Sequence, residues 1–219
     1  MAANELPLFP LNLVLFPGMV LPLHIFEPRY RQMVTECQQE NRPFGVVLVR
    51  PESKFMYEET YPIGTTAEIH ELDELKDGRF NLMARGVQRF RILSQHRKKP
   101  YLSALVEPFE DISEPTHMLT SSARQAEDLF RTYLSILLEA AGRKTMQVDL
   151  PTIPAELSYF IASVLDAENE QKQQLLENPS TLQRLQEEIT FLHREVPFLR
   201  QMLVGDSHFA DHPDRSMLN

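Results

Sequence analysis

The stretch Phe80-Asn-Leu-Met-Ala-Arg-Gly-Val-Gln-Arg-Phe-Arg-Ile92 has the two-residue period of a β-strand. The apolar side chains that share one parity, and that we expect to face inward, are Phe80, Leu82, Ala84, Phe90 and Ile92. The arginines that share the other parity are Arg85, Arg89 and Arg91. Gly86 lies in the middle, where a bulge or bend would let so long a strand curl.

Strand patterns flank this stretch on both sides. Residues 66–75 precede it, and the pair Asp77-Gly78 predicts a hairpin, because glycine tolerates the positive φ of the turn. The run from Phe44 to Arg50 has apolar residues at both parities, which indicates burial on both faces. A further strand over residues 101–109 would close the sheet. We therefore predict a small barrel-like or strongly curled sheet.

One helix is expected to interrupt this β-rich half. Pro28 suits a position in its first turn. The apolar side chains that follow at helical spacing are Tyr30, Met33, Val34 and Cys37.

The period becomes helical after the proline- and acid-rich stretch 107–115. An apolar stripe from Leu129 to Ala140 ends at Gly142, and Pro154 opens the next helix. A short helix is expected over residues 170–177. Ser180, with Gln183 three residues later, predicts a capping box at the start of the last helix.

The last helix carries a stripe of apolar residues in steps of three and four. Its members are Leu182, Leu185, Ile189, Leu192, Val196 and Leu199. Such a seam either packs within its own bundle or pairs with a second chain, and its short length favours the bundle. Residues 204–219 lose the pattern, and we expect a loose tail there.

Charge divides the chain at the same boundary as periodicity. Residues 1–109 contain 13 basic and 13 acidic side chains, whereas residues 110–219 contain 9 and 18 and so account for the net charge of −9. This excess argues against binding of nucleic acid, which relies on neutralised phosphates. We predict an α+β chain with a β-rich lobe over residues 1–110 and a helical lobe over residues 116–203.

Composition is that of an ordinary globular protein, with 42% apolar and 24% charged residues among 219. No apolar stretch approaches the roughly 20 residues that span a bilayer. The N-terminal segment does not have the features of a secretory signal, and a single cysteine fits a reducing compartment. These features predict a cytoplasmic protein without a membrane anchor.

No motif predicts catalysis, a cofactor or a metal. The sequence contains no Walker A loop, no dinucleotide fingerprint and no nucleophile elbow. Cys37 lies on the apolar stripe of its helix, where an inert core thiol is the expected state. His208 and His212 have a spacing that could bind metal on a helix, but Pro213 argues against a helix there.

The segment Glu5-Leu-Pro-Leu-Phe-Pro-Leu-Asn-Leu-Val-Leu-Phe-Pro-Gly-Met-Val-Leu-Pro-Leu-His-Ile-Phe-Glu-Pro-Arg-Tyr30 resembles the start of the N-terminal domain of Lon-type ATP-dependent proteases. Further similar segments follow in order at residues 64–69, 78–92 and 172–177, so that the resemblance covers about residues 5–203. It implies a β-rich lobe of PUA-like shape followed by a helical lobe. It also implies recognition of protein substrates without hydrolysis, because the ATPase and peptidase lie in later domains of that family, and it identifies the chain as similar to free-standing versions.

The leading hypothesis is therefore a non-catalytic module that binds unfolded or degron-bearing proteins, or a separate protease, as an adaptor or chaperone-like factor in protein quality control. The candidate peptide-binding residues are Phe16, Pro17, Met19, Arg29, Arg85 and Arg89. An RNA-binding module that uses the arginine face is the alternative, because PUA-like domains elsewhere bind RNA. An enzyme of unrecognised type is the third hypothesis. Sequence alone leaves the oligomeric state open.

Overall fold

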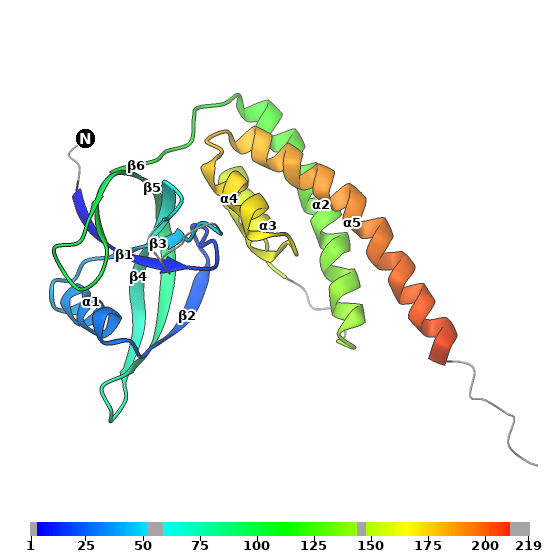
Figure 1. Ribbon diagram of the computed structural model, residues 1–219. Coiled ribbons are helices and arrows are strands. Elements are labelled where there is room, and N and C mark those ends of the chain that lie inside the picture. The colour runs from blue at the N-terminus through cyan, green and yellow to red at the C-terminus, as the bar shows by residue number, and fades with distance from the viewer. Residues whose placement is uncertain (1–3, 52–58, 144–147, 211–219) are drawn as a thin grey trace, which may run out of the picture.

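The computed structural model of the protein describes residues 4–51, 59–143 and 148–210, with side chains described as far as Leu203. Its two lobes follow one another along the chain (Figure 1). All the strands and one helix form the first lobe, and the remaining helices form the second. The predicted α+β class is confirmed.

Six strands form the sheet of the first lobe: β1 (Asn4–Leu11), β2 (Val20–Ile25), β3 (Phe44–Leu48), β4 (Ile63–Glu74), β5 (Phe80–His96) and β6 (Ser103–Pro108). Their order is β2-β5-β4-β3-β1-β6, and the additional pairing of β5 with β6 closes the sheet on itself. Only β1 and β3 run parallel among these described pairs. The predicted hairpin is present between β4 and β5, where Gly78 has a φ of 75°.

The long strand β5 changes its facing at a β-bulge. Ala67 pairs with Gly86 whereas Thr65 pairs with Arg89, so β5 contains one extra residue at this point. Arg85, before the bulge, is exposed, whereas Arg89, after it, turns into the protein interior. A bulge or bend was expected at Gly86, and the predicted burial of Phe90 and the packing of Ile92 are confirmed, whereas the expectation that Arg89 shares the exposed face of Arg85 is wrong.

Two clusters fill the first lobe. α1 (Pro28–Gln39) covers one of them, and its four predicted apolar side chains are all buried there together with Phe80, Leu82 and Ala84. Phe90 lies in the other cluster with Leu6 and Leu8 of β1. The two clusters lie on opposite faces of the sheet, since successive residues of β3, Val46 and Val47, belong to one and the other. The bulge reverses parity in β5, so Phe90 faces the other cluster from Ala84.

The second lobe consists of α2 (Thr116–Ala140), α3 (Pro154–Val164), α4 (Asn169–Glu177) and α5 (Thr181–Ala210). α2 and α5 lie side by side and extend away from the sheet, and α3 and α4 lie between this pair and the β-rich lobe (Figure 1). The apolar seam of α5 packs against α2 and α3 within the same chain, as the bundle interpretation predicts. α5 continues to Ala210 with Pro197 inside it, so the helix extends into the segment expected to be a tail, and residues 211–219 lie outside the described part.

Ser180 caps α5 as predicted, although only half of the capping box is present. The backbone N–H of Gln183 donates to Ser180 Oγ at 3.0 Å, whereas the N–H of Ser180 donates to Asn178 Oδ1 at 2.9 Å. Glu114, from the linker between the lobes, accepts a hydrogen bond from Ser180 Oγ at 2.6 Å and another from the N–H of Leu182 at 3.0 Å. The linker is thereby fixed to the first turn of α5.

Candidate functional site

A groove of about 790 Å³ lies between the two lobes. Its walls come from the turn before β2, from β4 and β5, and from α3 with the segment that precedes it. The residues that line it are Pro17, Gly18, Met19, Val20, Glu68, His70, Arg85, Gly86, Val87, Pro151, Glu156, Tyr159, Phe160 and Ser163. Its volume falls in the range of roughly 300–1,000 Å³ that is typical of ligand sites.

A tight contact between a turn and a strand shapes the β-lobe wall. The N–H of Gly18 donates to the carbonyl oxygen of Gly86 at 2.8 Å, and the N–H of Gly86 donates to that of Met19 at 2.9 Å. A Cβ atom on Gly86 would lie 2.4 Å from the carbonyl oxygen of Phe16, so only glycine permits this approach. The turn and the bulge of β5 therefore form one continuous surface.

Apolar side chains are exposed on this surface. Val20 is 51% exposed and Val87 is 46% exposed, and both line the groove. The partly buried side chain of Phe160 faces the same space from α3. Exposed aliphatic groups beside an aromatic wall can bind an apolar side chain of a partner through removal of water from both surfaces.

The floor of the groove belongs to the junction between the lobes. Tyr159 of α3 lines the groove and is otherwise buried. Its ring lies 6.3 Å from the ring of Phe16, centroid to centroid, and both belong to an apolar cluster that also contains Leu48 and Leu175. The groove is thus built on a contact that holds the lobes together.

Arg89 crosses this junction from the β-rich lobe. Its side chain is only 2% exposed. Nη1 donates hydrogen bonds to the carbonyl oxygens of Leu176 at 2.7 Å and Asn178 at 2.9 Å, and Nη2 donates to the carboxylate of Asp111. The last turn of α4 is therefore attached directly to β5.

Arg184 of α5 reaches the same carboxylate from the other side. Its Nη1 and Nη2 atoms donate to the two oxygens of Asp111 at 2.6 and 2.9 Å, which is a bidentate arrangement. The guanidinium lies 4.4 Å from the ring centroid of Tyr159, a cation–π distance, and the hydroxyl of Tyr159 donates to Asp111 at 3.3 Å. One carboxylate in the linker thus joins β5, α3 and α5.

The electrostatics of this network favour an ionised Asp111 and a neutral Glu188. Burial by itself raises the pKa of Asp111, but the hydrogen bonds and charges of Arg184 and Arg89 outweigh it and lower the pKa below its ordinary value. Burial raises the pKa of Glu188 well above its usual range, despite a hydrogen bond from Ser158 at 2.9 Å. Glu188 Oε2 has no hydrogen-bond partner among the described residues, which suits a protonated carboxyl better than a carboxylate.

The sequence matches the family of the ATP-dependent protease La (Lon) substrate-binding domain over residues 5–194. The chain belongs to this family. The predicted resemblance to the N-terminal domain of Lon-type proteases is confirmed, since the match covers both lobes as far as α5.

Lon proteases share this region with the chain. The Lon protease of Anaeromyxobacter dehalogenans is 29% identical over 199 residues, which are 89% of this chain and 24% of that protein. The Lon protease of Syntrophus aciditrophicus is 31% identical over 206 residues, 89% of this chain and 25% of that protein. The chain therefore spans about a quarter of the length of the curated relatives it matches.

Solved structures agree on the fold of this Lon substrate-binding domain. The Lon N-terminal domain protein from Xanthomonas campestris is 26% identical with a TM-score of 0.62, covering 85% of this chain and 98% of that one. The N-terminal domain of Lon protease from Mycobacterium avium complex has a TM-score of 0.66 over 87% of this chain and 98% of that chain at 18% identity, and so supports the fold alone.

Three of the six candidate binding residues line the groove of this Lon domain: Pro17, Met19 and Arg85. Phe16 is completely buried beneath it, because its ring is needed in the cluster between the lobes. Arg89 is likewise buried in the ion network, so its expected exposure is wrong. Arg29 lies on α1, outside the groove lining, where it pairs with Glu27 at 2.8 Å.

The arginine face proposed for RNA is divided by the bulge. Arg89 is buried, and Nη1 of Arg91 lies 3.5 Å from Oε1 of Glu107, an ion pair. Arg85 is the cross-strand neighbour of Glu68. The three guanidinium groups therefore do not form the continuous positive surface that phosphate binding requires.

The remaining residues that line the groove have no sequence feature that would predict a binding site. Val87 is distinguished only by its position on the exposed face after Arg85, and Phe160 was expected on a helix face without reference to any groove. Glu156 and Tyr159 likewise become neighbours of β5 only through the packing of α3 against the first lobe. That packing joins distant parts of the chain, and the apolar periodicity of a single helix does not indicate which distant element it will contact.

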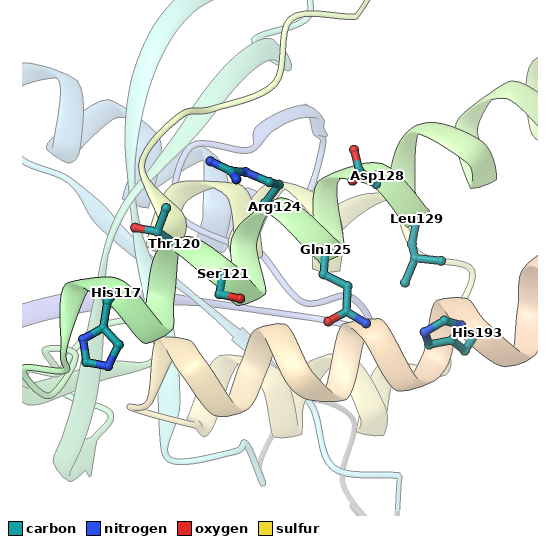
Figure 2. A pocket seen from close by; sticks show the side chains of 8 residues that line it. All are labelled: His117, Thr120, Ser121, Arg124, Gln125, Asp128, Leu129 and His193. Atoms are coloured by element: carbon teal, nitrogen blue, oxygen red, sulfur yellow. The ribbon is translucent and has the colours of Figure 1, made fainter.

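A second hollow of about 690 Å³ lies between α2 and α5. Figure 2 shows that Gln125 and Leu129 point toward His193 of α5, whereas Arg124 and Asp128 point away and His117 lies far along α2. Its polar side chains are exposed and do not converge on one point. This hollow is a trough between neighbouring helices and offers no assembled group of functional side chains.

Cys37 is a buried, unreactive thiol. Burial raises the pKa of Cys37 to about 11, so the thiol is un-ionised in the core at neutral pH. The described residues contain no cluster of three or more His, Cys, Asp or Glu placed to hold a metal ion, and His208 and His212 lie beyond the described side chains. Within the described ranges, no helix has the length and apolarity needed to cross a membrane.

Proposed function

We propose that this Lon substrate-binding domain binds exposed apolar segments of unfolded or degron-bearing proteins in the groove between its lobes. The observation that carries this proposal is the exposure of Val20 and Val87 opposite Phe160 in a groove built by both lobes. Aliphatic groups left in water favour a partner that covers them, at about 25 cal/mol for each Å² of apolar surface removed from water.

The rigid floor supports binding because it lowers the entropic cost of association. Tyr159 is held by the Phe16 ring, by the Arg184 guanidinium and by Asp111, so it has little freedom to lose when a segment binds. A preformed groove of this kind accepts many sequences of similar character, since its contacts are chiefly apolar and non-directional.

Membership of the family supports a proposal for the biological setting. In the relatives, this region is one quarter of a protease, and we propose that here it acts as an adaptor or chaperone-like factor in protein quality control. A bound segment would either be passed to a separate protease or be kept from aggregation. The single cysteine supports a reducing compartment, and we place this activity in the cytoplasm.

A matched pair of substitutions on β5 tests the proposal. Val87 and Leu93 are exposed to similar extents, 46% and 48%, but only Val87 lines the groove. We expect Val87→Asp to weaken binding of a reduced, carboxymethylated and permanently unfolded protein at least about tenfold, because its charge must lose water when the groove is covered. Leu93→Asp should leave binding unchanged. Fluorescence anisotropy provides the measurement, and equal loss or equal retention of affinity in both variants would refute the groove as the site.

A further inference from the structure

The groove contains charged side chains that the fold itself does not use. Glu68 of β4, Arg85 of β5 and Glu156 of α3 are all exposed. No ion pair or side-chain hydrogen bond engages any of the three within the described residues. Charges that are left unpaired around an apolar groove are available to a bound partner.

The balance of these charges is negative. Glu68 and Arg85 are cross-strand partners on adjacent strands, so their charges largely offset one another at the β-lobe wall. Glu156 on the opposite wall has no ion-pair partner among the described residues, so the lining carries two carboxylates against the single guanidinium of Arg85.

We infer that the groove selects apolar segments that carry a lysine or arginine next to the apolar residue, and disfavours segments flanked by aspartate or glutamate. This inference rests on the proposed function and specifies its substrate class. In the bound state, the apolar side chain covers Val20 and Val87, while the neighbouring cation lies toward Glu156. A flanking acidic residue in the same place would face the Glu156 carboxylate.

The expected difference in affinity between lysine-flanked and glutamate-flanked segments is small because the groove charges are exposed to water. All the charges concerned remain in contact with water, where a single exposed ion pair contributes only modestly to binding. Replacement of attraction by repulsion acts at both flanks of a segment, so we expect a lysine-flanked segment to bind about threefold to tenfold more tightly than a glutamate-flanked one. Because the interaction is solvent-exposed, the ratio should decrease as ionic strength shortens the Debye length below about 10 Å.

Three fluorescein-labelled peptides with the same Leu-Val-Phe centre, flanked by lysine, glutamine or glutamate, provide the test. We expect the order of affinity lysine, glutamine, glutamate for the unmodified chain in fluorescence anisotropy. The double variant Glu68→Gln/Glu156→Gln should remove most of this order while keeping affinity for the glutamine-flanked peptide. Glu139→Gln, which replaces an exposed carboxylate of α2 outside the groove, should change nothing.

The outcomes separate this inference from the function on which it rests. Equal binding of all three peptides by the unmodified chain would overturn the charge selection and leave apolar binding intact. Binding of none of them would count against the proposed function itself. Glu156 lies in the first turn of α3, where a carboxylate stabilises the helix, so its substitution can also change the fold. The salt dependence of the unmodified chain is therefore a second measurement that needs no variant. A preference for the lysine-flanked over the glutamate-flanked peptide that does not fall with added salt would overturn the inference.

Discussion

Substitution of Asp111 by alanine should loosen the junction between the lobes. The carboxylate accepts hydrogen bonds from two arginines that are 2% and 0% exposed, and without it both cations remain buried with no counter-charge in the network. Removal of one partner from a buried ion pair costs about 3–5 kcal/mol. The Asp111 side chain is itself 23% exposed, so water can partly replace it, and we expect the lower end, about 3 kcal/mol.

Urea unfolding followed by circular dichroism measures this change directly, with Glu110→Ala as the matched control. Glu110 is the exposed neighbour of Asp111, and its substitution should change the unfolding free energy by less than about 0.5 kcal/mol. For a chain of this size, about 3 kcal/mol corresponds to a melting temperature lowered by roughly 6–12 °C. A difference between the two variants below about 1 kcal/mol would refute the assigned role of the network.

The pH dependence of the same pair gives an independent check. The pKa of Asp111 is lowered in the folded chain, so its contribution is present above the ordinary aspartate pKa of about 3.9 and is lost as pH falls through the folded value. The stability gap between the unmodified chain and Asp111→Ala should therefore narrow only in acid. A gap that narrowed between pH 5 and pH 8 would contradict an ionised carboxylate in this range.

Two further predictions concern buried positions. Gly86→Ala should lower the unfolding free energy by about 1–3 kcal/mol in urea titrations, because the new Cβ would lie 2.4 Å from the carbonyl oxygen of Phe16; an unchanged midpoint would show that the turn is not held against β5. Glu188→Gln should gain stability relative to the unmodified chain as pH rises above about 4.3, by up to about 1.4 kcal/mol per pH unit, because the raised pKa means that Glu188 must take up a proton to fold. A stability difference independent of pH between 4 and 8 would show that Glu188 is ionised in the fold.

Local chemistry was sufficient to predict most elements. Asp77-Gly78 predicted its hairpin because the positive φ of Gly78 is a property of the turn itself. Pro28 and Pro154 each begin a helix in the structure, since a fixed φ and a missing N–H are tolerated only in the first turn. α2 was predicted only from Leu129 onward, because its first turns bury small residues such as Ala123 and Ala126 that give a weak apolar stripe.

The candidate site was predicted less well, for reasons specific to each residue. Pro17 and Met19 were correctly expected at a binding surface because the turn between strands that contains them keeps part of each side chain accessible. Phe16 precedes them in the same turn, but its burial depends on Tyr159 of α3, a partner 143 positions away in the chain. Arg89 was assigned to the wrong face because parity was carried unchanged through Gly86, where one extra residue in β5 reverses it.

Site-specific photocrosslinking tests the central claim most directly. A benzophenone amino acid at position 87 should crosslink an unfolded protein, and the same group at position 93, equally exposed on the same strand, should not. Mass spectrometry should locate the crosslinked client segments, and we predict apolar stretches among them. Crosslinks of equal yield from both positions, or from position 93 alone, would contradict a binding groove between the lobes.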